Sequence, residues 1–211
     1  MMPTRLTRRL RFAGLLVPLL LAGCGGLVKL PNSGPAPSLY NLTPIDSAAV
    51  QPVKLLLRIE DPTVGGGLDT PMIARRSSPN ELQYFAGVRW SGRPGEMLQN
   101  VLVQSFENIG QDVTEARGGA VVPAQYELQV DVRDFQAEYY HGATTPTVHV
   151  RLALKLVRLG PLGSAGQRVV DETVQAGGAD MAAVVAAFDQ AAHQALQETL
   201  GWTLARLTPG P

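Results

Sequence analysis

The second half of the chain alternates apolar and polar residues in a way that predicts consecutive strands. Apolar side chains occupy every second position over 126–132 and again over 148–156. This period of two is typical of a strand with one buried face. The turn-forming segment 139–142 lies between the two runs and predicts a hairpin, so we expect an antiparallel pair. A turn at 161–166 and a third strand at 167–175 complete the prediction for this region.

Phe135 falls out of step with this alternation. It lies beyond the run that ends at Val132, on the wrong parity for the same face. The break predicts either a β-bulge or the end of the strand.

Shorter apolar segments in the first half also predict strands. Residues 38–42 predict a first strand, and a strand pair is expected on either side of the turn at 77–80, from 68–76 and 81–90. The run at 53–59 is short, partly β-branched and bounded by turn residues, which favours a strand buried on both faces. Residues 112–115 predict one more short strand.

Two segments show the helical period of 3.6 residues. The first begins near Pro94 and ends at Gly110, residues that suit the first turn and the stop of a helix. The second begins after Asp180, a predicted N-cap, and extends to about Trp202. Their apolar positions form one face each and are Leu98, Val101, Leu102, Ser105, Phe106 and Ile109, and Met181, Val184, Val185, Phe188, Ala192, Ala195, Leu196 and Thr199.

Together these elements predict an α/β fold. We expect a single sandwich domain over 38–207, with a mixed, largely antiparallel sheet covered by two main helices. Helices on the sheet would explain an apolar run such as 53–59. Trp90, at the end of a predicted strand, is expected to be a core or cap residue.

The N-terminus has the pattern of a bacterial lipoprotein. Four arginines precede an apolar run of about ten residues, too short to span a membrane and typical of a signal peptide. Leu21, Ala22 and Gly23 then lead directly to Cys24, the only cysteine. This order is that of a lipobox, which predicts a signal at 1–23 and a Cys24 thiol that carries a diacylglyceryl group. An ordinary signal peptide with a chance cysteine is the alternative.

The mature chain is mildly acidic behind a flexible linker. Residues 24–37 comprise the acylated cysteine and a segment rich in Gly and Pro, typical of a linker. The sequence has 18 basic and 18 acidic residues, and four of the basic ones (Arg5, Arg8, Arg9 and Arg11) leave with the signal, so 14 against 18 remain. This balance argues against nucleic acid as a partner.

The sequence offers few candidates for chemistry. With Cys24 acylated there is no thiol left for catalysis, a disulfide or a metal site. His141, His149 and His193 are far apart in sequence, and the pairs Glu96 with Glu107 and Asp131 with Asp134 lie at polar positions of amphipathic elements. Glycines 65–67 lack the residues that complete a phosphate-binding loop. We therefore expect no catalytic residue, no metal ligand and no cofactor.

Adjacent aromatic residues are the strongest candidates for a partner contact. Tyr139 and Tyr140 lie at a predicted loop tip beside Phe135. Tyrosine gives a large contact area at low entropic cost, so these residues form a possible contact with a partner. Packing against a neighbouring hairpin is the alternative.

The order of these segments resembles the ABC-type transport auxiliary lipoprotein family, which includes PqiC-like lipoproteins found with MCE-domain proteins. After the lipobox, the segments that carry the resemblance are 39–44, 68–76, 82–90, the helix with Glu96 and Leu98, 128–135, and the alanine-rich helix near Trp202. The glycine-rich insert at 65–67 departs from the pattern.

The resemblance implies an outer-membrane lipoprotein on the periplasmic face. It would act as a non-catalytic auxiliary component, with an ABC transporter and an MCE-domain protein as partners, in the transport of lipids or other hydrophobic compounds. Two alternatives stay open: a lipoprotein that carries lipid in its own pocket between sheet and helices, and a structural envelope-assembly lipoprotein. A hydrolase of envelope polymers is the weakest alternative.

Overall fold

The domain is built on one mixed β-sheet. The computed structural model describes residues 35–46, 50–115, 123–160 and 163–207. Nine strands are assigned within these residues. Six follow one another in the order β1 (Ser38–Tyr40), β5 (Glu81–Trp90), β4 (Met72–Ser78), β7 (Tyr126–Glu138), β2 (Leu57–Ile59) and β6 (Val113–Glu115). The other three are β3 (Thr63–Val64), β8 (Thr147–Arg158) and β9 (Gly163–Gln175).

The long strand β7 lies at the centre of this sheet. One of its edges pairs with β8 in antiparallel fashion along its whole length, and β8 pairs in turn with β9. Its other edge is shared in succession by three parallel strands, with register Leu57 to Tyr126, Thr63 to Asp131 and Arg75 to Ala137. A single strand therefore connects every part of the sheet.

A β-bulge interrupts β7 where the sequence loses its alternation. The register with β8 shifts between Val132 and Asp134, after which Phe135 pairs with Val150. The extra residue returns Phe135 to the buried face, where its side chain is 1% exposed. Of the two predicted alternatives, a bulge or a strand end, the bulge is confirmed, and the strand continues to Glu138.

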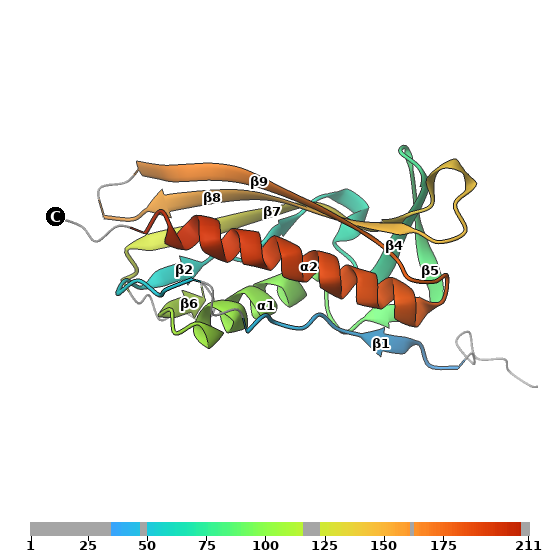
Figure 1. Ribbon diagram of the computed structural model, residues 1–211, viewed down its shortest axis with the longest axis horizontal. Coiled ribbons are helices and arrows are strands. Elements are labelled where there is room, and N and C mark those ends of the chain that lie inside the picture. The colour runs from blue at the N-terminus through green and yellow to red at the C-terminus, as the bar shows by residue number, and fades with distance from the viewer. Residues whose placement is uncertain (1–34, 47–49, 116–122, 161–162, 208–211) are drawn as a thin grey trace, which may run out of the picture. The chain divides into compact units, whose positions relative to one another are not determined.

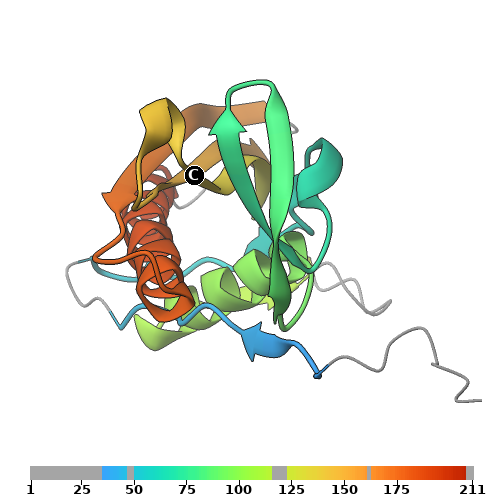
Figure 2. The ribbon, with the colours of Figure 1, turned by 90° about the vertical axis from the view of Figure 1, so that its right-hand side faces the viewer.

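Two helices, α1 (Pro94–Asn108) and α2 (Met181–Leu204), lie together on the concave side of the curled sheet (Figures 1 and 2). The backbone N–H of Ala183 donates to Asp180 Oδ1 at 3.0 Å, which confirms the predicted N-cap. At the end of α1, Gly110 adopts φ +80°, a conformation that glycine takes at little cost.

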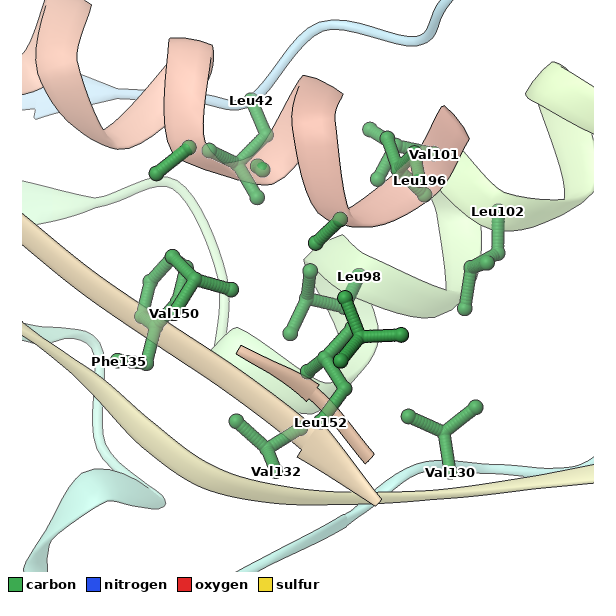
Figure 3. Close-up of a cluster of buried hydrophobic side chains, with 14 of the residues drawn as sticks. Leu42, Leu98, Val101, Leu102, Val130, Val132, Phe135, Val150, Leu152 and Leu196 are labelled. Atoms are coloured by element: carbon green, nitrogen blue, oxygen red, sulfur yellow. The ribbon is translucent and has the colours of Figure 1, made fainter. Parts of the chain in front are cut away.

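Side chains from both helices and the sheet meet in one core. Figure 3 shows Leu98 and Leu102 of α1 and Leu196 of α2 pointing toward Val130 and Leu152 of the sheet. Further along this core, the rings of Trp90, Phe135 and Phe188 pack with centroids 5.1–5.5 Å apart. Trp90 is 1% exposed, in agreement with the predicted core position. The predicted α/β sandwich with a mixed sheet and two main helices is confirmed.

The segment 53–59 differs from its prediction. Only Leu57–Ile59 forms a strand, because the side chain of Gln111 satisfies the backbone before it. Gln111 accepts from the Val53 N–H at 2.8 Å and donates to the Leu55 carbonyl at 2.6 Å. Within β2, Leu57 and Ile59 are fully buried, but Arg58 points to the opposite face and pairs with Glu127. The strand is therefore buried on one face, and both helices cover that same face.

The other strands either match the boundaries predicted from the sequence or add to them. The predicted strand pair is β4 and β5, which are antiparallel. The short strand β3 was not predicted, residues 66–68 form a 3₁₀ turn, and β9 already includes Gly163. The signal, Cys24 and the linker up to residue 34 lie outside the described residues. No helix in the described part is both long enough and apolar enough to cross a membrane.

Candidate functional site

Phe135, one of the residues predicted to contact a partner, lies in the core. Its ring packs 5.1 Å from Phe188 and 5.5 Å from Trp90, and the bulge in β7 turns it away from solvent. The prediction that Phe135 offers a contact to a partner is therefore wrong. The lost alternation allowed a bulge at this point but did not show that the bulge would return Phe135 to the core.

Tyr139 packs against the neighbouring β4–β5 hairpin. Its ring meets that of Phe85 edge-on, with centroids 6.3 Å apart. The guanidinium of Arg75 lies 5.7 Å from both ring centres, in the range of cation–π contacts, and donates to Gln83 Oε1 at 2.8 Å. Burial raises the pKa of the Tyr139 hydroxyl, and the Arg75 charge partly opposes this.

Tyr140 follows Tyr139 directly in the chain, and we call Arg75, Phe85, Tyr139 and this adjacent tyrosine the arginine–aromatic corner. Tyr140 begins the 3₁₀ turn η2 (Tyr140–Gly142) between β7 and β8, which confirms the predicted hairpin connection. Burial raises its pKa, and so do the charge of Glu138 and a hydrogen bond to that carboxylate. Both tyrosines are half-buried. Contact with a partner stays a prediction for them.

A second polar cluster crosses three strands on the outer face, defined as the face of β7, β8 and β9 that points away from the helices. His149 of β8 lies at its centre. Its Nε2 is 2.7 Å from Asp171 Oδ1 on β9, and its Nδ1 is 3.1 Å from Glu138 Oε1 on β7. Burial of the ring lowers its pKa, but the hydrogen bonds to both carboxylates outweigh this, so the pKa of His149 is raised above its ordinary value.

The next row of the outer face is also charged. Arg151 pairs in register with Asp134 on one side and Asp171 on the other, and its Nε lies 3.5 Å from Asp171 Oδ2. Three carboxylates thus face one arginine and one titratable histidine. The outer face at this end carries a negative charge that becomes smaller when His149 is protonated.

An open groove of about 580 Å³ lies further along the outer face. Charged side chains dominate its lining, among them Glu60, Glu127, Asp131, Arg133 and Lys155. Such a lining suits polar or ionic groups rather than acyl chains.

Glu60 and Glu127 form an unequal pair in this groove. Burial raises the pKa of Glu60, and the neighbouring Glu127 raises it further by its charge and by a hydrogen bond. Burial also raises the pKa of Glu127, but hydrogen bonds from Gln129 and Arg58 outweigh it and lower this pKa. As the pH rises, Glu127 therefore loses its proton before Glu60 does.

Of the remaining titratable candidates, His193 and Glu96 contact the backbone of neighbouring residues, and Glu107 is exposed. His193 lies with Nε2 3.0 Å from the Thr43 carbonyl, so it contacts the segment after β1. Glu96 accepts from the backbone N–H of Arg93 at the start of α1. Glu107 lies 11 residues further along the helix, about 16 Å away at 1.5 Å per residue. In the described parts of the chain, no three His, Asp or Glu side chains gather as metal ligands.

Comparison with known proteins identifies the family. Residues 40–199, most of the chain, match a protein family described as "ABC-type transport auxiliary lipoprotein component". The chain belongs to this family, which confirms the resemblance found in the sequence. The family is described as an auxiliary component of ABC-type transport.

The chain is also similar to three known proteins. The crystal structure of XCC0632 from Xanthomonas campestris, a DUF330 protein, is 30% identical, with a TM-score of 0.70 over 81% of this chain and 94% of that one. A crystal structure of an uncharacterized protein is 19% identical, with a TM-score of 0.62 over 80% and 99% of the two chains, and is similar in fold. The uncharacterized protein bll6063 of Bradyrhizobium diazoefficiens is 28% identical over 85% of this chain and 48% of its own. The chain thus spans about half the length of this curated relative.

Proposed function

We propose that the protein is an outer-membrane lipoprotein, anchored through acylated Cys24, that docks an ABC-type transport system from the periplasmic side. Its partners are an MCE-domain protein and the transporter components associated with it, and the transported compounds are lipids or other hydrophobic molecules. The domain itself does no chemistry on them. The family assignment supports the role in transport, and the lipobox supports the anchor.

The observation that carries the docking role is the packed interior. A pocket for lipid would have to lie between the sheet and the two helices. The side chains that line this space have almost no accessible surface: Leu57, Leu102, Leu152, Phe188 and Leu196 are all 0% exposed. A cavity wide enough for an acyl chain would leave accessible surface on its walls. The packing therefore favours a docking domain over a lipid carrier.

Two surfaces are suited to bind a protein partner. The arginine–aromatic corner presents partly exposed rings and a guanidinium, residue types that are enriched at energetically important interface positions. The outer face presents the charged rows around His149 and Arg151. Charged rows of this kind select partners by electrostatic complementarity.

Co-purification from envelopes tests this function. An affinity-tagged copy, solubilised in mild detergent, is expected to retain an MCE-domain protein or ABC transporter component. Deletion of the protein is expected to impair lipid traffic. If the protein retains no such component and lipid traffic is normal without it, the proposal is wrong.

The anchor has its own test. Cys24→Ser removes the acylated atom, so the variant is expected to keep its signal and to be absent from the outer membrane while its domain still folds. Processing and outer-membrane sorting of the Cys24→Ser variant would contradict the anchor.

A further inference from the structure

An exposed apolar row lies on the strands that follow the linker. Leu39 of β1 and Met72 of β4 both pair in register with Arg89 of β5, so the three side chains share one face of the sheet. Leu39 is 64% exposed and Met72 is 37% exposed. We call Leu39, Arg89 and Met72 the β1 row; its strands lie at one edge of the sheet (Figure 1).

The gathering of these residues is unusual for this domain. Three large apolar side chains are prominently exposed in the described part of the chain, and two of them flank Arg89. The third, Val169, lies on β9, which pairs with β8 on the other side of β7. Single exposed apolar residues need no explanation, whereas exposed apolar side chains that share one patch can mark a site of interaction.

Arg89 gives the row a positive centre. Its side chain is exposed and forms no ion pair with any residue that the structure describes. An arginine with apolar neighbours on both sides matches the boundary between phospholipid headgroups and acyl chains, where apolar groups insert and the cation meets phosphate.

The length of the linker limits how far this row can lie from the lipid on Cys24. Thirteen residues, 25–37, separate Cys24 from the start of β1, and even fully extended they span only about 50 Å. Such a tether raises the effective concentration of the membrane at β1, so a weak contact is sufficient. The row is also far smaller than the roughly 800 Å² per partner of a stable protein interface. A lipid surface therefore fits better than a protein.

We propose that the β1 row rests on the surface of the membrane that holds Cys24, with Leu39 and Met72 among the headgroups and Arg89 on anionic phosphate. This inference rests on the proposed lipid anchor. The contact orients the domain, so that the sheet edge at β1 faces the bilayer and the edge at β9 faces the periplasm.

Spin labelling of the complete acylated protein tests this contact. Because the Cys24 thiol is blocked by its lipid, a cysteine introduced as Leu39→Cys or Val169→Cys is the only free thiol. Each labelled protein is placed in vesicles of phosphatidylethanolamine and phosphatidylglycerol. Collisions of the label with oxygen, which enriches in lipid, and with a water-soluble nickel complex are then measured.

The two positions form a matched pair of exposed strand residues. The ratio of oxygen to nickel collisions is expected to be at least about threefold higher at position 39 than at 169. In vesicles that contain phosphatidylglycerol, Arg89→Gln is expected to lower the ratio of oxygen to nickel collisions at position 39. In vesicles of phosphatidylcholine alone, the substitution is expected to leave this ratio unchanged. An equal ratio at 39 and 169 would overturn the proposal, and an Arg89→Gln effect absent from both lipids would overturn the role of the arginine.

Two further measurements distinguish this contact from the lipid anchor itself and from contact with a second copy of the protein. Flotation of the vesicles reports the acyl anchor, so a protein that floats but keeps position 39 in water refutes the β1 contact and leaves the anchor intact. Strong dipolar coupling between labels at 39 in two copies would show that a second molecule covers the row, and would also refute the contact with lipid.

Discussion

The imidazole of His149 lies 2.7 Å from Asp171 and links the carboxylates of two strands across a third. Asp171 comes from β9 and Glu138, the second carboxylate, from β7. The charged groups around the ring are these two, Asp134 on β7 and Arg151 on β8. This geometry makes the outer face sensitive to pH.

The first prediction concerns the pH dependence of stability. Because the folded-state pKa of His149 is raised, its protonated form stabilises the fold. This contribution is complete below the unfolded pKa of about 6.5 and is lost as the pH rises through the folded pKa. His149→Gln is therefore expected to lower the free energy of unfolding by about 1 kcal/mol at low pH and by less above the folded pKa.

Urea unfolding of both proteins between pH 5.5 and 8.5 measures this difference. His141→Asn is the control, because His141 is exposed and Asn tolerates its φ of +57°. A constant difference between wild type and His149→Gln across the range would contradict the assignment.

The second prediction concerns Glu60, whose pKa is raised beside Glu127. A raised folded pKa means that the protonated form of Glu60 stabilises the fold at low pH, and that this is lost as the pH rises through that pKa. Glu60→Gln mimics the protonated form. We expect it to be neutral near pH 4 and to raise the free energy of unfolding by up to about 1 kcal/mol near pH 8.

The exposed Glu107→Gln on α1 is the matched control for removal of one negative charge. Urea midpoints at both pH values provide the measurement. Destabilisation by Glu60→Gln at pH 8 would show that ionised Glu60 has a favourable partner in the groove.

The third prediction separates core from surface among the aromatic residues. Phe135→Ala is expected to lower the free energy of unfolding by about 3–5 kcal/mol, because it removes a buried ring that packs against both Trp90 and Phe188. Tyr140→Ala, at a half-buried loop position, is expected to cost only about 1 kcal/mol. Similar losses for the two variants in chemical denaturation would contradict the placement of Phe135 in the core.

How much of this arrangement could be predicted depends on whether a feature is local. The helices, the strands β4, β5, β7 and β8 and the Asp180 cap follow from periodicity and capping chemistry, which neighbouring residues determine. The consequence of the bulge for Phe135 could not be predicted, because either a bulge or a strand end explains the lost parity. The side chain of Gln111 decides where β2 begins, and no local pattern reveals a partner 58 residues away.

The same limit applies to the surfaces. Sequence alternation places His149 on the polar side of its strand, but the contacts with Glu138 and Asp171 depend on the register of three strands. The β1 row likewise requires the pairing of Leu39 and Met72 with one residue, Arg89. Tyr139 and Tyr140 can be placed together from the sequence, because they are adjacent in the chain.

The fourth prediction concerns the attachment of the segment after β1. Asp189 of α2 accepts from the Thr43 N–H and from its hydroxyl, both at 2.8 Å. Asp189→Ala removes both hydrogen bonds and is expected to cost about 1 kcal/mol, since the site is partly exposed. Hydrogen exchange at the Thr43 amide is expected to become faster, whereas Gln190→Ala, an exposed neighbour on the same helix, is expected to leave it unchanged. Unaltered exchange in Asp189→Ala would refute the role of this contact.

Photocrosslinking in living cells tests the docking role most directly. A photoreactive phenylalanine in place of Tyr140 probes the arginine–aromatic corner, with the same group at the exposed Glu107 as control. The account predicts an adduct between position 140 and an MCE-domain or ABC transporter component, and none at 107. A fully acylated, normally abundant protein whose position 140 forms no such adduct would contradict it.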